Sequence, residues 1–215
     1  MQHHKPQGFS VAELLISLAI IVLLATFAIF QLGSSQQTDE LQTAARQLAA
    51  DLRSMQSRAL AGQNLKACTD GSDLRVCEYS EASCTPGTCT EEIPYSFGIN
   101  ITQNSTNYST FADLNPVPGG DNALTNSKEV ILTRDLLQVS NNVIISTIQS
   151  ASSSGLNPPQ VKADISFTRQ NGVAHIIDST VPPEPSLILI TLKHIETNAT
   201  IQVEVNRVTG RISIL

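Results

Sequence analysis

The sequence has no tryptophan, aromatic residues make up only 4% of it, and charged residues only 15%, against about 25% in an average soluble protein. Basic residues are scarce, because 13 Lys and Arg stand against 19 Asp and Glu and give a formal net charge of −6. Nucleic-acid backbones are bound by clustered Lys and Arg. The composition therefore argues against nucleic acid as a partner.

Sequence motifs of catalysis are absent as well. No G-x-S-x-G, H-E-x-x-H, P-loop or G-x-G-x-x-G occurs in the chain. His175 and His194 each stand alone in predicted strands, and Asp178 lies close to His175 without a nucleophile to complete a triad. The chain contains no C-x2-C pair, so its cysteines do not indicate a zinc ribbon. We expect no enzyme activity, no cofactor and no bound metal.

The chain does contain one long apolar run. Val11–Leu32 comprises 22 residues with Glu13 as the one charge and with no Gly or Pro. At about 1.5 Å per residue it spans the roughly 30 Å of a bilayer core, and it exceeds the ~7–15 apolar residues of a secretory signal. Lys5 precedes the run, whereas Asp39 and Glu40 follow it. The positive-inside rule then predicts a cytoplasmic N-terminus with the rest of the protein outside.

Glu13 is out of place in such a run. A carboxylate costs about 2.5–3.5 kcal/mol at the centre of a bilayer and less near its edge. Two interpretations stay open. The side chain reaches the membrane edge, or it meets a cation supplied by a neighbouring chain.

The segment around Glu13, KPQGFSVAELLISLAI from Lys5 to Ile20, resembles the class III leader of type IV prepilins and type II secretion pseudopilins. In that family a membrane peptidase cuts after the glycine and methylates the new terminal amine. The resemblance implies cleavage between Gly8 and Phe9, N-methylation of Phe9, and Glu13 as the assembly residue. It also implies three partners: other pilin or pseudopilin subunits, the prepilin peptidase and an inner-membrane assembly platform.

Beyond the apolar run the pattern predicts an amphipathic helix. Its apolar residues recur at spacings of 4, 3, 4, 3 and 4, and they are Leu41, Ala45, Leu48, Leu52, Met55 and Ala59. Gly62 and the two residues after it are a plausible stop. With about three heptads a separate coiled coil is an alternative, but we favour packing of this stripe on the chain's own sheet.

The region from 64 to 128 is rich in Ser, Thr, Asn, Gly and Pro, and we expect irregular structure there with short strands near 74–79 and 94–101. It holds all four cysteines of the chain: Cys68, Cys77, Cys84 and Cys89. Outside the cytoplasm an even number of cysteines predicts two disulfides. Of three possible pairings, short chain closure favours Cys68–Cys77 with Cys84–Cys89. The acidic residues of 68–92 are an alternative calcium site, but without EF-hand spacing they favour a solvated face.

After residue 128 apolar and β-branched residues alternate, which predicts an antiparallel sheet. The expected strands are Glu129–Thr133, Asn142–Ile148, Val161–Thr168, Val173–Ile177, Ser186–Lys193, Ala199–Val205 and Arg211–Leu215. Asn171-Gly172 and Thr209-Gly210 supply the positive φ of tight hairpin turns. The phrases Ile165–Gly172 and Val205–Ile212 resemble strands of the minor pseudopilin H and FimT-like group, which implies a minor subunit.

The sequence thus predicts an α+β, pilin-like fold with a long N-terminal helix packed on a C-terminal antiparallel sheet. We divide it into a cleaved cytoplasmic leader (1–8), a transmembrane and assembly helix (9–33), its amphipathic continuation (34–63), the loop-rich cysteine region (64–128) and the sheet (129–215). The expected function is a structural subunit of a type IV pilus or a type II secretion pseudopilus. It begins as a single-pass protein of the bacterial inner membrane with its C-terminal domain outside. The alternative is an extracellular binding module that uses the helix only as a tether.

Overall fold

The structure is a computed structural model that describes residues 10–70, 73–77, 89–114, 123–124, 127–136, 142–152, 155–169, 174–177 and 185–215. Within these ranges the side chains of 28–35, 70 and 73 are not described. The chain forms two compact units, Met1–Asp39 and Glu40–Leu215. Each unit is considered by itself.

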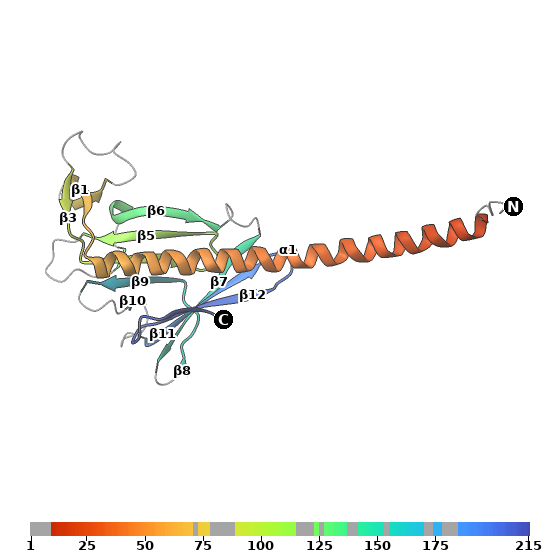
Figure 1. The fold of residues 1–215 in the computed structure, drawn as a ribbon. Helices are drawn as coiled ribbons and strands as arrows, with labels where there is room; N and C mark the ends of the chain where they lie inside the picture. The colour runs from red at the N-terminus through yellow and green to blue at the C-terminus, as the bar shows by residue number, and fades with distance from the viewer. Residues whose placement is uncertain are drawn as a thin grey trace, which may run out of the picture. The chain divides into compact units, whose positions relative to one another are not determined.

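Helix α1 covers Val11–Ala61 (Figure 1). It ends at Gly62, whose φ of 58° is left-handed. The amide of Gly62 donates to the Ala59 carbonyl at 3.0 Å, and that of Gln63 donates to the Arg58 carbonyl at 3.1 Å. These two bonds form a Schellman motif, in which glycine is favoured because it lacks a Cβ. The predicted stop at Gly62 is confirmed.

In the first unit α1 is apolar and uncovered. Every large apolar side chain from Val11 to Phe27 is between 52% and 78% exposed. Among the residues that the structure describes, no helix is both long enough and apolar enough to qualify as a membrane span.

In the second unit the other part of α1 contributes one face to a hydrophobic core. The six residues of the predicted stripe, Leu41, Ala45, Leu48, Leu52, Met55 and Ala59, are all at most 5% exposed. They share one apolar cluster with residues of the sheets. The stripe therefore packs inside its own chain, as predicted, and not in a coiled coil.

Among its described residues, the rest of this unit contains three antiparallel sheets. The smallest has the order β2-β1-β3 and consists of β1 (Leu65–Asp70), β2 (Asp73–Val76) and β3 (Thr90–Glu92). The second has the order β10-β9-β4-β5-β6. Its strands are β4 (Ser96–Thr102), β5 (Asn107–Asp113), β6 (Val130–Asp135), β9 (Lys162–Thr168) and β10 (Ala174–Ile177).

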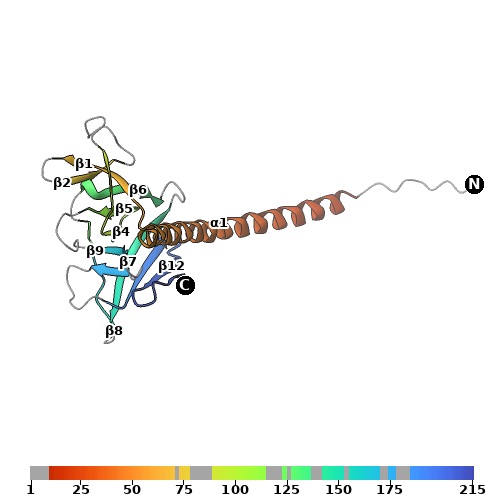
Figure 2. The same ribbon diagram turned by 60° about the vertical axis from the view of Figure 1, so that its left-hand side comes forward.

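The third sheet has the order β13-β12-β11-β7-β8. Its strands are β7 (Val143–Ser152), β8 (Gly155–Leu156), β11 (Leu187–His194), β12 (Thr200–Asn206) and β13 (Ile212–Ile214). A short 3₁₀ helix, η2 (Ser127–Glu129), precedes β6. The second half of α1 lies beside strands of the two larger sheets (Figure 2), and side-chain hydrogen bonds join it to β5 and to β13.

The α+β class with antiparallel sheets is confirmed, and each of the seven strands predicted after residue 128 is present. Two expectations need correction. These strands do not form one sheet, because β6, β9 and β10 belong to one five-stranded sheet and β7, β11, β12 and β13 to the other. The region from 64 to 128 is also less irregular than predicted, since it supplies all three strands of the small sheet and two central strands, β4 and β5, of a large one.

Both predicted hairpins join paired strands. β12 pairs with β13 across a turn in which Gly210 has a φ of 65°, so the Thr209-Gly210 turn is confirmed. β9 pairs with β10, although Asn171 and Gly172 lie outside the described residues.

Candidate functional site

The start of α1 is a reciprocal capping arrangement between Ser10 and Glu13. The amide of Ser10 donates to Glu13 Oε2 at 3.2 Å, and the amide of Glu13 donates to Ser10 Oγ at 3.4 Å. Because α1 begins at Val11, Ser10 occupies the N-cap position and Glu13 the third helical position. This is the capping box, in which each side chain satisfies a backbone N–H of the other residue.

The capping box gives Glu13 a partner within its own chain. Its carboxylate lies at the positive end of the helix dipole, where negative charge is stabilised. Sequence analysis left two interpretations of Glu13 open and gave it the assembly role through the family resemblance, but it missed Ser10 as a partner, although S-x-x-E before an apolar run is a known signature of a helix start. Gly8 and Phe9, the predicted cleavage site, lie outside the described residues.

The polar side chains within the apolar run bond to the helix itself. Ser17 Oγ donates to the Glu13 carbonyl at 2.8 Å, and Thr26 Oγ1 lies 3.0 Å from the Val22 carbonyl and 2.9 Å from that of Leu23. Their hydroxyl groups therefore interrupt the apolar surface little. Val11–Phe27 therefore presents a largely apolar exposed surface.

The cysteine region contains a disulfide between Cys77 and Cys89. The predicted pairing of sequence neighbours is therefore wrong. Strand pairing explains the difference, because β1 pairs with β2 on one side and with β3 on the other. Cys77 follows β2 and Cys89 precedes β3, so the sheet brings together two residues separated by 12 positions. The difference in loop-closure entropy between the possible pairings is small. The hydrogen bonds that pair β1 with β2 and β3 outweigh it.

Cys68 lies in β1 between these neighbours, and its Sγ is within 4.8 Å of both other sulfur atoms. Cys68 is disulfide-bonded too, whereas Cys84 is outside the described residues. Of the acidic residues between 68 and 92, only Glu91 and Glu92 have described side chains, and both are at the surface of β3.

We expect non-reducing peptide mapping of the full-length chain to find Cys77 joined to Cys89, and by elimination Cys68 joined to Cys84. Replacing Cys77 and Cys89 together by Ser should loosen the small sheet and cost about 2–3 kcal/mol of stability, because a loop of about a dozen residues is no longer closed. Proteolysis confined to the cysteine region would show this loss. Tightly bound zinc in the purified protein, with free thiols, would contradict the disulfide assignment.

A buried polar cluster fixes α1 to the neighbouring strands. Asp51 of α1 accepts a hydrogen bond from the Tyr108 hydroxyl of β5 at 2.6 Å. Gln47 Nε2 donates to both carboxylate oxygens at 3.2 Å, and Arg134 Nε of β6 is 3.4 Å from Asp51 Oδ2. Burial raises the pKa of the Tyr108 hydroxyl well above its usual value, and the Asp51 carboxylate raises it further.

This raised pKa predicts a loss of stability at high pH. Above pH ~10 an unfolded tyrosine loses its proton whereas the folded Tyr108 keeps it, so the unfolded state is favoured as pH rises. Between pH 9 and 11 we expect the free energy of unfolding to fall by about 1.4 kcal/mol more in the natural chain than in Tyr108→Phe. Urea unfolding of the full chain in detergent at both pH values measures this. Equal losses in the two proteins would contradict the assignment.

Two further contacts hold α1 to β13 and to the turn before it. Arg53 Nη2 donates to the Ile212 carbonyl at 2.9 Å, and Gln56 Nε2 donates to the Gly210 carbonyl at 3.0 Å. His194, predicted to be structural or exposed, is only 1% exposed at the end of β11. Its Nδ1 accepts from the Thr197 amide at 3.4 Å. Its Nε2 lies 3.5 Å from Glu40 Oε2 without a hydrogen bond. Its burial and its hydrogen bond with Thr197 indicate a structural role for His194.

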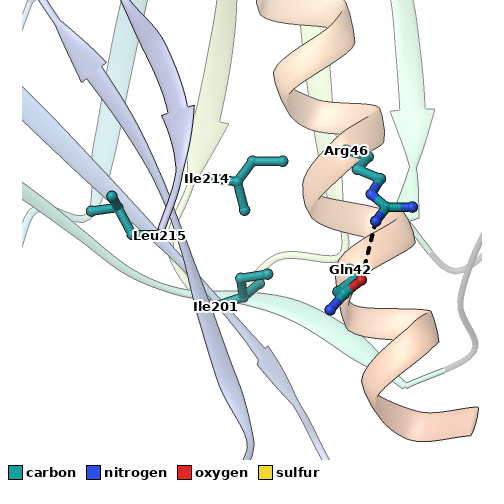
Figure 3. Close-up of a pocket in the computed structure, with 5 residues that line it drawn as sticks. All are labelled: Gln42, Arg46, Ile201, Ile214 and Leu215. Carbon is teal, nitrogen blue, oxygen red and sulfur yellow. Dashed lines mark hydrogen bonds between the residues drawn. The ribbon is translucent and has the colours of Figure 1, made fainter. Parts of the chain in front are cut away.

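A pocket of about 400 Å³ lies between α1 and the strands β12 and β13. It is lined by Gln42 and Arg46 of α1 and by Ile201, Ile214 and Leu215 (Figure 3). Ile214 projects from its strand toward the helix, and Arg46 Nη2 donates to Gln42 Oε1 at 3.2 Å. None of the five lining side chains carries a carboxylate, thiol or imidazole that could act as a nucleophile or a base.

Comparison with known proteins finds no matching protein family, no matching curated protein and no matching solved structure.

Proposed function

We propose that this chain is a pilin-like structural subunit, a minor pilin or minor pseudopilin. In this proposal the prepilin peptidase removes residues 1–8, and the N-terminal helix then assembles the subunit into a type IV pilus or a type II secretion pseudopilus. One observation carries the proposal. A G|F sequence, a glutamate at the fifth position after the proposed cut and an uninterrupted apolar run coincide in one short segment.

The exposed apolar surface of α1 supports the proposal. α1 exposes its apolar side chains throughout Val11–Phe27 but buries one stripe in the core of the second unit. Such an exposed surface needs a partner, either lipid or other helices. A long helix with antiparallel sheets is also compatible with the pilin-like architecture that the leader implies.

The proposed location follows from the charges that flank the helix and from the disulfide. Lys5 before the apolar run places the N-terminus in the cytoplasm. The disulfide between Cys77 and Cys89 belongs in an oxidising compartment outside it. The subunit would therefore wait in the inner membrane with its second unit outside and leave the bilayer when it is incorporated.

The proposed role of Glu13 is to pair with the terminal amine of a neighbouring subunit. Cleavage frees the amine of Phe9 as a cation, and the peptidase then transfers a methyl group to it from a methyl donor. This amine belongs to the residue four positions before Glu13 in the sequence. Each chain then carries an acid and a base in apolar surroundings, where an unpaired charge is costly. Pairing between chains satisfies both groups, and it also fixes the axial offset between adjacent helices.

The competing function is a binding module tethered by the same helix. A tether needs an apolar helix, but it needs neither a glycine before Phe9 nor an acid inside the apolar run. Nor does the pocket between α1 and β12 contain groups that indicate a particular ligand.

Co-expression with a prepilin peptidase tests the proposal. We expect the natural chain to be shortened by its eight leader residues, and Gly8→Leu to remain at precursor size because a side chain obstructs the close approach to the backbone at the cut. Gln7→Leu is the matched control and should be cut normally. Equal maturation of Gly8→Leu and the natural chain would show that the leader assignment is wrong.

A further inference from the structure

Before cleavage, the cation proposed to neutralise Glu13 does not exist. In the precursor the nitrogen of Phe9 is part of a peptide bond, and the nearest basic side chain is Lys5, eight positions before Glu13. A bare carboxylate within a membrane-inserted helix is costly. A hydrogen-bond donor on the chain itself would reduce this cost while the precursor waits in the membrane.

The capping box supplies such a group from the chain itself. Ser10 N lies 3.2 Å from Glu13 Oε2, and Glu13 N lies 3.4 Å from Ser10 Oγ. The Ser10 carbonyl is already the acceptor of the first helical bond, from Leu14 N at 3.2 Å. Without Glu13, the Ser10 N–H would be one of the donors that a helix start leaves unsatisfied. The hydrogen bond between the acid and the amide therefore lowers the desolvation cost of both groups, and apolar surroundings strengthen the contact.

We propose that Ser10 is a positioning residue that holds the Glu13 carboxylate against the helix start in the precursor and so allows the helix to enter the membrane before processing. Cleavage then creates the amine, which takes over the carboxylate when a neighbouring subunit arrives. The inference rests on the proposed function, because it requires that α1 enters a membrane.

The test is the membrane insertion of the full-length precursor in cells that lack the peptidase, so that neither cleavage nor assembly contributes. Ser10→Pro removes the donating N–H as well as the hydroxyl. We expect it to lower the carbonate-resistant, membrane-inserted fraction about fivefold, as expected from the loss of a helix cap. Ser10→Thr keeps both groups of the cap and is the conservative control, which should insert like the natural chain.

A second substitution separates positioning from simple capping. Glu13→Leu removes the charge that the Ser10 amide hydrogen-bonds. The double variant Ser10→Pro, Glu13→Leu should therefore insert as well as the natural chain. If Ser10 only starts the helix, Glu13→Leu will not rescue the double variant, and that result would overturn the inference. Normal insertion of Ser10→Pro alone would overturn it as well.

The two failures can be told apart. If the natural precursor is itself absent from the membrane fraction, the proposed function fails together with the inference. If the natural precursor inserts and Ser10→Pro inserts equally, only the inference fails.

Discussion

Glu13→Gln is expected to abolish incorporation of the subunit into the filament while leaving cleavage and membrane insertion at the level of the natural chain. Glutamine serves as well as glutamate in a capping box. The hydrogen bond from the Ser10 amide, 3.2 Å long in the natural chain, is therefore retained. The negative charge is lost. In apolar surroundings the methylated amine of a neighbouring Phe9 would then be buried without a counter-charge, which is strongly destabilising.

The matched control is Ser10→Thr, which alters the same turn and keeps the charge. We expect it to be incorporated normally. Separate gels for cleavage, carbonate extraction and the sheared filament fraction distinguish the three steps. Undiminished incorporation of Glu13→Gln would show that the charge has no role between subunits, and that Glu13 serves its own helix only.

The second large effect is expected from Gly98→Ala in β4. A Cβ at this position would lie 2.6 Å from the Ile165 carbonyl oxygen of β9 and 2.6 Å from Phe111 Cζ of β5. The Ile165 carbonyl belongs to the backbone of β9, which is paired with β4, so it cannot move away from the added Cβ. Overpacked core positions cost about 1–3 kcal/mol, and we expect the upper end here. The melting temperature should fall by about 6–12 °C.

Two variants test the cause. Gly155→Ala adds a Cβ that meets nothing within 4 Å, so it should report only the strain of a positive φ, about 1–3 kcal/mol. Adding Phe111→Leu to Gly98→Ala shortens one neighbour and leaves the Ile165 carbonyl in place, so stability should not recover. Thermal unfolding of the full chain in detergent, followed by circular dichroism, measures each variant. Recovery of the natural stability when Phe111→Leu is added to Gly98→Ala, or no loss in Gly98→Ala alone, would contradict the clash with the Ile165 carbonyl.

Alternation of apolar residues predicts strands reliably where one face is buried. β7 has a burial pattern close to period two, and β11 is strictly alternating. β5 was missed because its sequence, NYSTFAD, contains turn-forming residues at both ends. Its last four residues are all buried, as expected for a strand covered on both faces, and such a strand carries no alternation for the sequence to display.

Tertiary pairing decides what local sequence leaves open. The division of strands between two sheets and the partner of Cys77 both depend on contacts between distant segments, which spacing along the chain does not encode. The start of α1 is the opposite case. Ser10 and Glu13 are three residues apart, so their capping box was readable from the sequence.

The intact mass of the subunit, purified from cells that contain the prepilin peptidase, tests the central claim most directly. We expect one species that has lost residues 1–8 and gained the mass of a single methyl group, with fragmentation placing that group on the amine of Phe9. A chain that keeps Met1–Gly8, or one that is cut at any other peptide bond, would contradict its assignment as a pilin-like subunit.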